Sequence, residues 1–160
     1  VYGMYLAELP DQDLIHILNA QAAALATMIA GMTEAVGVSS YAAGKWTAKQ
    51  VLGHIVDSER IFAYRALCIA RSESQPLPGF DENNYAANSH ADQRSLASLG
   101  ADFAAARAAT LALVRSLEPH TLDLPGNANG KRLTPRACLF VLAGHAEHHL
   151  KILNLRYLKA

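Results

Sequence analysis

Four stretches of the sequence repeat apolar residues at helical spacing, and this pattern limits the possible folds more than any other feature. Side chains three and four residues apart lie on one face of a helix, so each stretch predicts a helix with an apolar face. Four such helices bury these faces against one another, which predicts an all-α four-helix bundle. The predicted helices cover residues 11–33, 47–71, 92–117 and 134–158.

The second and fourth predicted helices begin at capping sequences. Thr47 is followed three residues later by Gln50, the spacing of a capping box in which each side chain bonds the other residue's backbone. Thr134 can serve as an N-cap, and Pro135 then occupies the first helical position, where a missing N–H costs little. These two helix starts are therefore the best defined of the four.

Two long connections, residues 72–91 and 118–133, join the predicted helices and are marked by proline and glycine. Loops of this length are unusual in a small domain and often functional, so we expect them to select the substrate. The chain has 160 residues, of which 51% are hydrophobic and 18% charged, which is ample for one buried core. We therefore predict a single domain over residues 1–160.

Balanced charge argues against a nucleic-acid or membrane partner. Lys and Arg together number 14, and Asp and Glu also number 14, so the formal net charge is zero. Such a chain has no broad attraction for nucleic acid or for an anionic membrane surface. No apolar run approaches the roughly 20 residues that span a bilayer. We expect a small-molecule substrate, no nucleic acid and no membrane.

The fourth predicted helix carries a pair of histidines with metal-binding spacing. His145 and His149 differ in direction by only ~40° and lie about 6 Å apart along the helix axis. Two imidazoles so placed can hold one metal ion, as in helical zinc sites. His148 is a geometric alternative to His149. We prefer His149 because it shares the apolar seam with Leu142 and Ile152.

A third ligand must come from another helix, and His54 in the apolar stripe of the second helix is the best candidate. Bundle cores often house metal sites built from facing helices. Three protein ligands with open positions are typical of a catalytic metal site. Alone, His54 could be a hydrogen-bonded core residue, and the HAEHH run could be a surface cluster. Their joint position on inward seams favours a metal site. No role is expected for His16, His90 and His120.

The two cysteines lie too far along their helices to join the same site. Cys68 is ~21 Å beyond His54, and Cys138 is ~10 Å before His145. They form no disulfide framework, so we interpret both as small core residues. The N-terminal residues also lack the features of a secretory signal, and a cytoplasmic location is the simplest expectation. An exported form made without its signal is the alternative.

Three of the charged residues that follow His54 on the second helix are considered for a role near the site. Asp57 lies on nearly the same face and could orient an imidazole, accept a proton or ligate the metal weakly, or it could be an ordinary exposed acid. Glu59 lies off that face and is expected to pair with a basic residue. Arg65 shares the His54 face, where it could contact an anionic substrate or form a buried ion pair.

Three segments together resemble the DinB-like, or YfiT-like, metalloenzyme family. They are YAAGKWTAKQVLGHIVDSERIFAYRALC at 41–68, LPGFDENNY at 77–85 and AGHAEHHLKIL at 143–153. The most specific parts are Trp46, shortly before the helix that carries His54, and the G-H-x-x-H-H motif at 144–149. The family is the damage-inducible four-helix type, and not the DNA polymerase that shares the DinB label.

This resemblance implies a four-helix bundle with a metal held by His54, His145 and His149. Nickel or zinc is the implied metal, with water in the open positions. Asp57 fits the acidic position that follows the family's first histidine. Some relatives transfer bacillithiol, mycothiol or glutathione, and others are isomerases. Dimers are common among them, so the resemblance also implies a homodimer.

These observations predict a metal-dependent enzyme that acts on a small molecule. The leading hypothesis is transfer of a low-molecular-weight thiol to an electrophile, with Asp57 or a metal-bound hydroxide accepting the thiol proton. Hydrolysis by metal-bound hydroxide is the close alternative, because it needs the same three histidines. A non-catalytic metal-binding stress-response module is the alternative of a different class.

Overall fold

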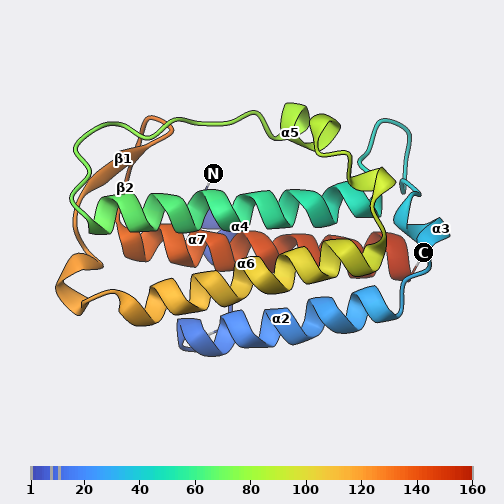
Figure 1. Ribbon diagram of the computed structural model, residues 1–160, viewed down its shortest axis with the longest axis horizontal. Coiled ribbons are helices and arrows are strands. Elements are labelled where there is room, and N and C mark those ends of the chain that lie inside the picture. Colours follow the sequence, from blue (N-terminus) through green and yellow to red (C-terminus); the bar gives the residue numbers. More distant parts are fainter. Residues whose placement is uncertain (1, 8, 11, 160) are drawn as a thin grey trace.

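The computed structural model describes residues 2–7, 9–10 and 12–159 and confirms the predicted four-helix bundle (Figure 1). Four long helices run side by side. They are α2 (Leu14–Ala30), α4 (Ala48–Ala70), α6 (Leu96–Ser116) and α7 (Pro135–Leu153). The shorter elements are α1 (Tyr2–Leu6), α3 (Glu34–Gly37), α5 (Glu82–Asn88), the 3₁₀ turns η1 (Ala91–Gln93) and η2 (Pro119–Thr121), the strands β1 (Gly126–Ala128) and β2 (Lys131–Leu133), and the π-helical turn η3 (Asn154–Leu158).

Helix α4 packs against both α7 and α6, and α2 packs against the same two helices on the opposite side of the bundle. The buried apolar side chains form two clusters. One gathers the end of α4 and the start of α7, around Phe62, Ile69 and Leu142. The other gathers the start of α4 and the end of α7, around Ile55 and Leu153. The core is therefore divided into two apolar halves along the bundle axis.

A layer of buried polar side chains separates the two apolar clusters. Its central contact is an ion pair in which the Arg107 guanidinium donates to the Glu59 carboxylate at 2.7 and 2.9 Å. Arg107 also donates to the Leu18 carbonyl at 2.7 Å, and Gln21 donates to the Ala143 carbonyl at 2.8 Å. The expected pairing of Glu59 with a basic residue is thus confirmed. These bonds satisfy groups that would be costly to bury alone.

The two predicted capping sequences are confirmed. Thr47 accepts from the Gln50 backbone N–H at 3.0 Å, and the Gln50 side chain accepts from the Thr47 N–H at 3.0 Å. Helix α4 therefore begins at Ala48 and ends within a residue of the predicted boundary. Thr134 accepts from the Ala137 N–H, and α7 starts at Pro135.

The other helix boundaries need correction. The first predicted helix corresponds to α2, which begins at Leu14 because the Asp13 side chain caps it. Asp11 lies outside the described residues. It ends at Ala30, since Thr33 already caps the separate short helix α3. The third helix begins at Leu96 and not at residue 92, because the Ser95 hydroxyl accepts from the Ser98 N–H.

Neither long connection is structureless, which corrects the sequence-based expectation. Residues 72–91 contain α5, whose first turn is capped by Asp81. Residues 118–133 contain a hairpin of β1 and β2, and its turn residues Asn129 and Gly130 both have positive φ. Such backbone angles are typical of a two-residue hairpin turn, for which Asn-Gly is the favoured sequence.

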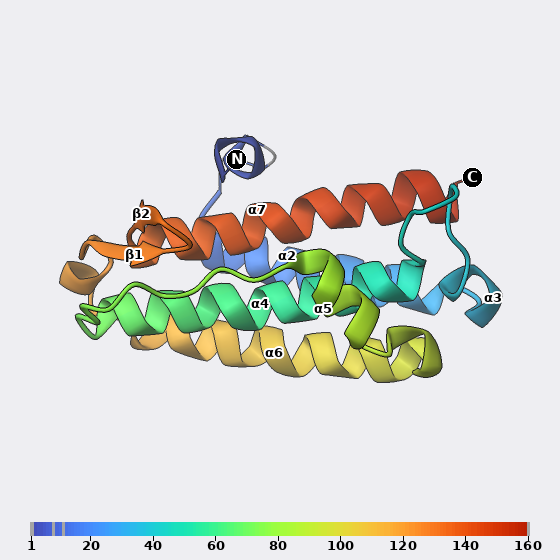
Figure 2. The same ribbon diagram turned by 90° about the horizontal axis from the view of Figure 1, so that it is seen from above.

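The two connections are bonded to each other. The Leu77 N–H donates to the Asn127 carbonyl and the Asn129 N–H donates to the Leu77 carbonyl, both at 2.9 Å. Figure 2 shows the first connection and α5 along α4, α1 beside α7, and the hairpin where α4 ends and α7 begins. These pieces are spread along the α4–α7 pair, from the hairpin at one end to α5 over the other half of α4.

Among the described residues, α6 is long and apolar enough to cross a membrane by length and composition alone. Core helices of bundles meet the same criterion. In this structure α6 packs against α4 and α2, and Arg107 points from it into the interior ion pair. Its apolar face is therefore used within the bundle.

Candidate metal centre

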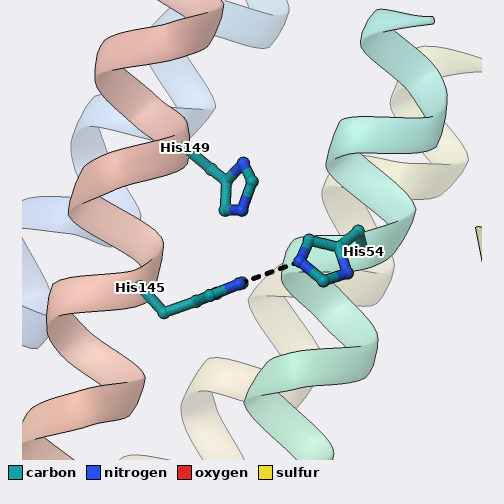
Figure 3. Close-up of side chains that lie close together, drawn as sticks. All are labelled: His54, His145 and His149. Atoms are coloured by element: carbon teal, nitrogen blue, oxygen red, sulfur yellow. Dashed lines mark hydrogen bonds between the residues drawn. The ribbon is translucent and has the colours of Figure 1, made fainter. Parts of the chain in front are cut away.

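Three histidines converge where α4 and α7 face each other (Figure 3). His54 comes from α4, and His145 and His149 come from successive turns of α7. Each offers one ring nitrogen, and these three atoms lie within 4.8 Å of one another. The Nε2 atoms of His54 and His145 are 2.8 Å apart. Helix packing thus brings together the three histidines that the sequence singled out.

Burial keeps all three imidazoles neutral near pH 7. It lowers the pKa of His54 to about 4. The pKa of His149 falls to about 3, mainly through burial and further through His54 and His148. Burial, assisted by the neighbouring histidines, holds the pKa of His145 well below its usual value. Neutral imidazole is the form that binds metal, so the site has its ligands in the competent state.

The donor set fits a divalent metal that prefers nitrogen ligands. Only one proton can lie between the facing Nε2 atoms of His54 and His145, so this contact satisfies one lone pair at most. The Nδ1 atom of His149 is buried and has no hydrogen-bond partner among the described residues. A cation bound by the three rings would take the place of the missing hydrogen-bond donors. Imidazole suits zinc and nickel, and three protein ligands leave coordination positions open.

Aromatic rings hold the histidines in place. The Trp46 ring lies 4.8 Å from the His54 ring, centroid to centroid. Tyr5 on α1 meets His145 edge-on at 5.4 Å and His148 at 5.7 Å. His148 therefore packs against α1 and does not belong to the group of three converging nitrogens, which His149 completes.

Helix α1 can approach the centre closely because residue 144 is a glycine. A Cβ at Gly144 would overlap the Tyr5 backbone carbonyl. Contacts between α1 and α7 then bring the Tyr5 ring onto His145, the next residue along α7. The glycine in the G-H-x-x-H-H segment thus has a packing role that its sequence position did not reveal.

Asp57 does not belong to the group of converging histidine nitrogens, and the catalytic role expected for it from the sequence stays a prediction. It lines a separate hollow between α4 and α6 together with Arg60, Arg94 and Asp102. Burial raises the pKa of Asp57, and the nearby charge of Arg60 opposes this rise. Three residues beyond His54, a side chain is rotated by ~60° around the helix. On α4 that rotation turns Asp57 from α7 toward α6.

Arg65 is buried but forms no ion pair with a carboxylate among the described residues. Its Nη2 donates to the Pro78 carbonyl at 2.9 Å, and its guanidinium lies 5.0 Å from the centre of the Phe62 ring. Of the two alternatives for this residue, the structure does not show the buried ion pair. Arg65 instead lines the same cavity as His54 and His145.

That cavity has a volume of about 540 Å³, which is within the usual range for a small-molecule site. Its inner wall is formed by side chains of α4 and α7, and its rim by α1, the first connection and the hairpin. Exposed side chains at the rim show that it reaches the surface. The lining residues are Tyr5, His54, Ser58, Phe62, Arg65, Phe80, Glu82, Asn129, Lys131, Arg132 and His145.

A model of the DinB superfamily matches residues 6–153 of the sequence. The chain belongs to the DinB superfamily. The solved structure of YfiT from Bacillus subtilis, described as "a probable metal-dependent hydrolase with an unusual four-helix bundle topology", superposes with a TM-score of 0.74. The sequences are 20% identical, and the match covers 86% of this chain and 79% of YfiT. No curated protein matches the sequence.

Several cavity residues of this DinB-superfamily chain were not found from its sequence. Ser58 stands one helical turn after His54, a spacing that places it on the same face. Lys131 and Arg132 follow directly after Asn129-Gly130, the best local signal for a hairpin. Reading that dipeptide as a turn would have drawn attention to the two cations after it.

Cys138 and Cys68 remain outside the DinB-type histidine cluster. Cys138 is buried, and burial raises the pKa of its thiol to about 11. Cys68 is partly buried in the same apolar cluster. Neither belongs to the converging group, as their distances along the helices predicted. His16, His90 and His120 are exposed.

Proposed function

We propose that this chain is a metal-dependent enzyme that acts on a small molecule in the cavity beside His54 and His145. His54, His145 and His149 would hold a divalent ion, zinc or nickel. The observation that carries the proposal is the convergence of three neutral imidazoles, two of which, those of His54 and His145, line an open cavity of about 540 Å³. A purely structural metal site is normally closed by four protein ligands, and this group offers three.

The chain's own residues would position both the ion and the substrate. A bound divalent ion supplies Lewis acidity, which activates a water or thiol nucleophile and polarises a substrate oxygen. Trp46 and Tyr5 fix two of the imidazole rings through their contacts. Phe62 and Phe80 give the cavity apolar walls that exclude water from the reacting group.

We propose hydrolysis as the first reaction to test. The fold shared with YfiT, itself described as a probable metal-dependent hydrolase, supports this choice. Glu82 is an acidic side chain that lines the cavity and could accept a proton from water. In this hypothesis Glu82 replaces Asp57, the proton acceptor expected from the sequence, because Asp57 faces α6.

Transfer of a low-molecular-weight thiol is the second candidate. Among the described residues, no carboxylate belongs to the group of three converging nitrogens, so a nucleophile bound there would depend on Glu82, which lines the cavity outside that group, as its base. A thiol is much more acidic than water and needs less assistance to ionise. This feature favours a thiol over water. A non-catalytic metal-binding module is less well supported, because such a module needs no open cavity at its metal. The homodimer and the cytoplasmic location expected from the sequence stay predictions.

One pair of assays tests both reactions on the same protein. Metal-stripped protein is reloaded with zinc or nickel and compared with the stripped form. The first assay offers nitrophenyl esters and phosphate esters; the second offers glutathione, bacillithiol or mycothiol with chlorodinitrobenzene. We expect metal-dependent turnover in one assay, lost in His149→Ala and kept in His120→Ala, an exposed histidine. Equal rates for loaded and stripped protein throughout would remove support for catalysis.

A further inference from the structure

We propose that the cavity takes an elongated organic anion, carrying a carboxylate or a phosphate group, and that Arg65 binds that group. The inference rests on the proposed function, because it names the substrate class of the same site. Its observations are independent of the metal, however. They concern the charge, burial and position of side chains on the side of the cavity away from His54.

Arg65 carries a buried positive charge. Its residue is only 2% exposed, and no carboxylate among the described residues pairs with it. Arg65 donates to the Pro78 carbonyl and lies over the Phe62 ring, and its charge also acts on the thiol of Cys138, which carries no charge near pH 7. A guanidinium has five N–H donors arranged to bind a planar oxyanion with two parallel bonds. Burying such a charge without a counterion is costly, so a ligand anion would relieve the cost.

The rim of the cavity adds further positive charge. Lys131 and Arg132 stand on the hairpin, exposed to solvent, and among the described residues Glu82 is the acidic side chain that lines the same space. The lining therefore has a local excess of positive charge, although the chain as a whole carries equal numbers of basic and acidic residues. A cleft lined by one sign of charge attracts ligands of the opposite sign.

The spacing of residues on α4 fixes the shape of the ligand. Arg65 lies 11 residues beyond His54, a rise of about 16 Å, and its side chain leans back toward the helix N-terminus. The anionic group would therefore lie roughly 10 Å from the histidines. Ser58 lies between them, and its buried hydroxyl has no hydrogen-bond partner among the described residues. It is available to a polar atom near the reacting end.

Aromatic side chains occupy the space between the two ends. Tyr5, Phe62 and Phe80 line the cavity, so the middle of the ligand should be apolar or aromatic. The connection between α4 and α5 contributes both Phe80 and the Pro78 carbonyl that orients Arg65. The long connection thus acts as a wall for the anionic end of the substrate.

The test measures binding to metal-free protein, so that a carboxylate cannot bind the metal instead. Calorimetric titration at pH 7 compares 3-phenylpropionate, phenyl phosphate and the uncharged 3-phenylpropanol. We expect the anions to bind at least tenfold more tightly than the alcohol. Arg65→Met should remove that preference, and Arg65→Lys should restore part of it. Arg71→Met, which removes an exposed charge from the end of the same helix, should leave it unchanged. Comparison of the two anions decides between carboxylate and phosphate.

A second variant covers the case in which Arg65→Met fails to fold. Lys131→Gln combined with Arg132→Gln alters only exposed side chains and should weaken anion binding severalfold. Equal affinity for anions and alcohol in the wild-type protein, or unchanged anion affinity in both variants, overturns the inference. That result would not contradict the proposed metal enzyme if zinc or nickel still binds. Conversely, a protein that binds the anions but takes up no metal would contradict the proposed function and not this inference.

Discussion

The Nε2 atoms of His54 and His145 face each other at 2.8 Å across the α4–α7 interface, although the residues are 91 positions apart in the chain. A neutral imidazole has one donor and one acceptor nitrogen, so the pair can share a single hydrogen bond. His149 adds a third ring next to them, and its Nδ1 atom has no hydrogen-bond partner in the part of the chain that the structure describes. Hydrogen bonds leave ring nitrogens of these three histidines without partners, and such nitrogens can bind a cation.

The first prediction concerns the pH dependence of the metal-free protein. Burial lowers the pKa of His54 to about 4 and of His149 to about 3, whereas in the unfolded chain both titrate near 6.5. The unfolded state therefore binds more protons below pH 6.5, and the free energy of unfolding should fall from there down to about pH 4. Each of the two histidines should contribute a loss on the order of 3 kcal/mol by pH 4, measured by urea denaturation.

His54→Gln removes one of these groups, so its stability should decline less steeply over the same pH range. His120→Gln, which changes an exposed histidine, should follow the wild-type curve. A metal-free wild-type protein whose stability does not change between pH 6.5 and 4.5 would contradict the burial of neutral histidines.

The second prediction concerns Asp57. Because its side chain faces Arg60 and Asp102 across α4 and α6, Asp57→Asn should leave metal content unchanged. Burial already raises the pKa of this carboxyl group, so a neutral amide should alter stability by less than about 1 kcal/mol. Metal analysis and thermal denaturation check both parts. Loss of the bound metal in Asp57→Asn would restore the role expected from the sequence.

The third prediction concerns the buried pair Glu59–Arg107. Both side chains are 1% exposed, so removing one leaves a buried charge without its partner. Glu59→Gln should cost about 3–5 kcal/mol of unfolding free energy. Asp123→Asn breaks the exposed pair with Arg136 and should cost less than about 1 kcal/mol. Similar losses in both variants, measured by urea denaturation, would argue against a structural role for the interior pair.

The fourth prediction concerns Gly144. A methyl group there would overlap the Tyr5 carbonyl, so Gly144→Ala should displace α1 from α7. Hydrogen exchange of the α1 amides should then become faster, while the amides of α4 stay protected. Gly3→Ala is the matched control, since a Cβ at that position meets no atom within 4 Å. Unchanged exchange in α1 of the Gly144→Ala protein would show that the contact is not required.

The long helices could be predicted because their signals are local. The Thr47–Gln50 capping box and the Thr134-Pro135 start each fix a boundary within a few neighbouring residues. The short elements were missed for the opposite reason. Helix α5 depends on one cap at Asp81, and each hairpin strand is three residues long, too short for an alternating pattern to show.

The site was predictable only in part. The spacing of His145 and His149 places both rings on one face of a single helix, which is a local property. The position of His54 beside them depends on the rotation of α4 against α7, and the same rotation turns Asp57 away. The surroundings of Arg65 depend on how the connection after α4 folds back over it. These are tertiary features that no local pattern encodes.

Metal uptake tests the central claim most directly. Stripped protein is equilibrated with zinc or nickel, freed of unbound ions by gel filtration, and analysed by inductively coupled plasma mass spectrometry. The structure predicts one ion per chain in the wild-type protein and in His120→Ala, and strongly reduced occupancy in His54→Ala and His149→Ala. Full occupancy in both of the latter variants would contradict a metal centre at these three histidines.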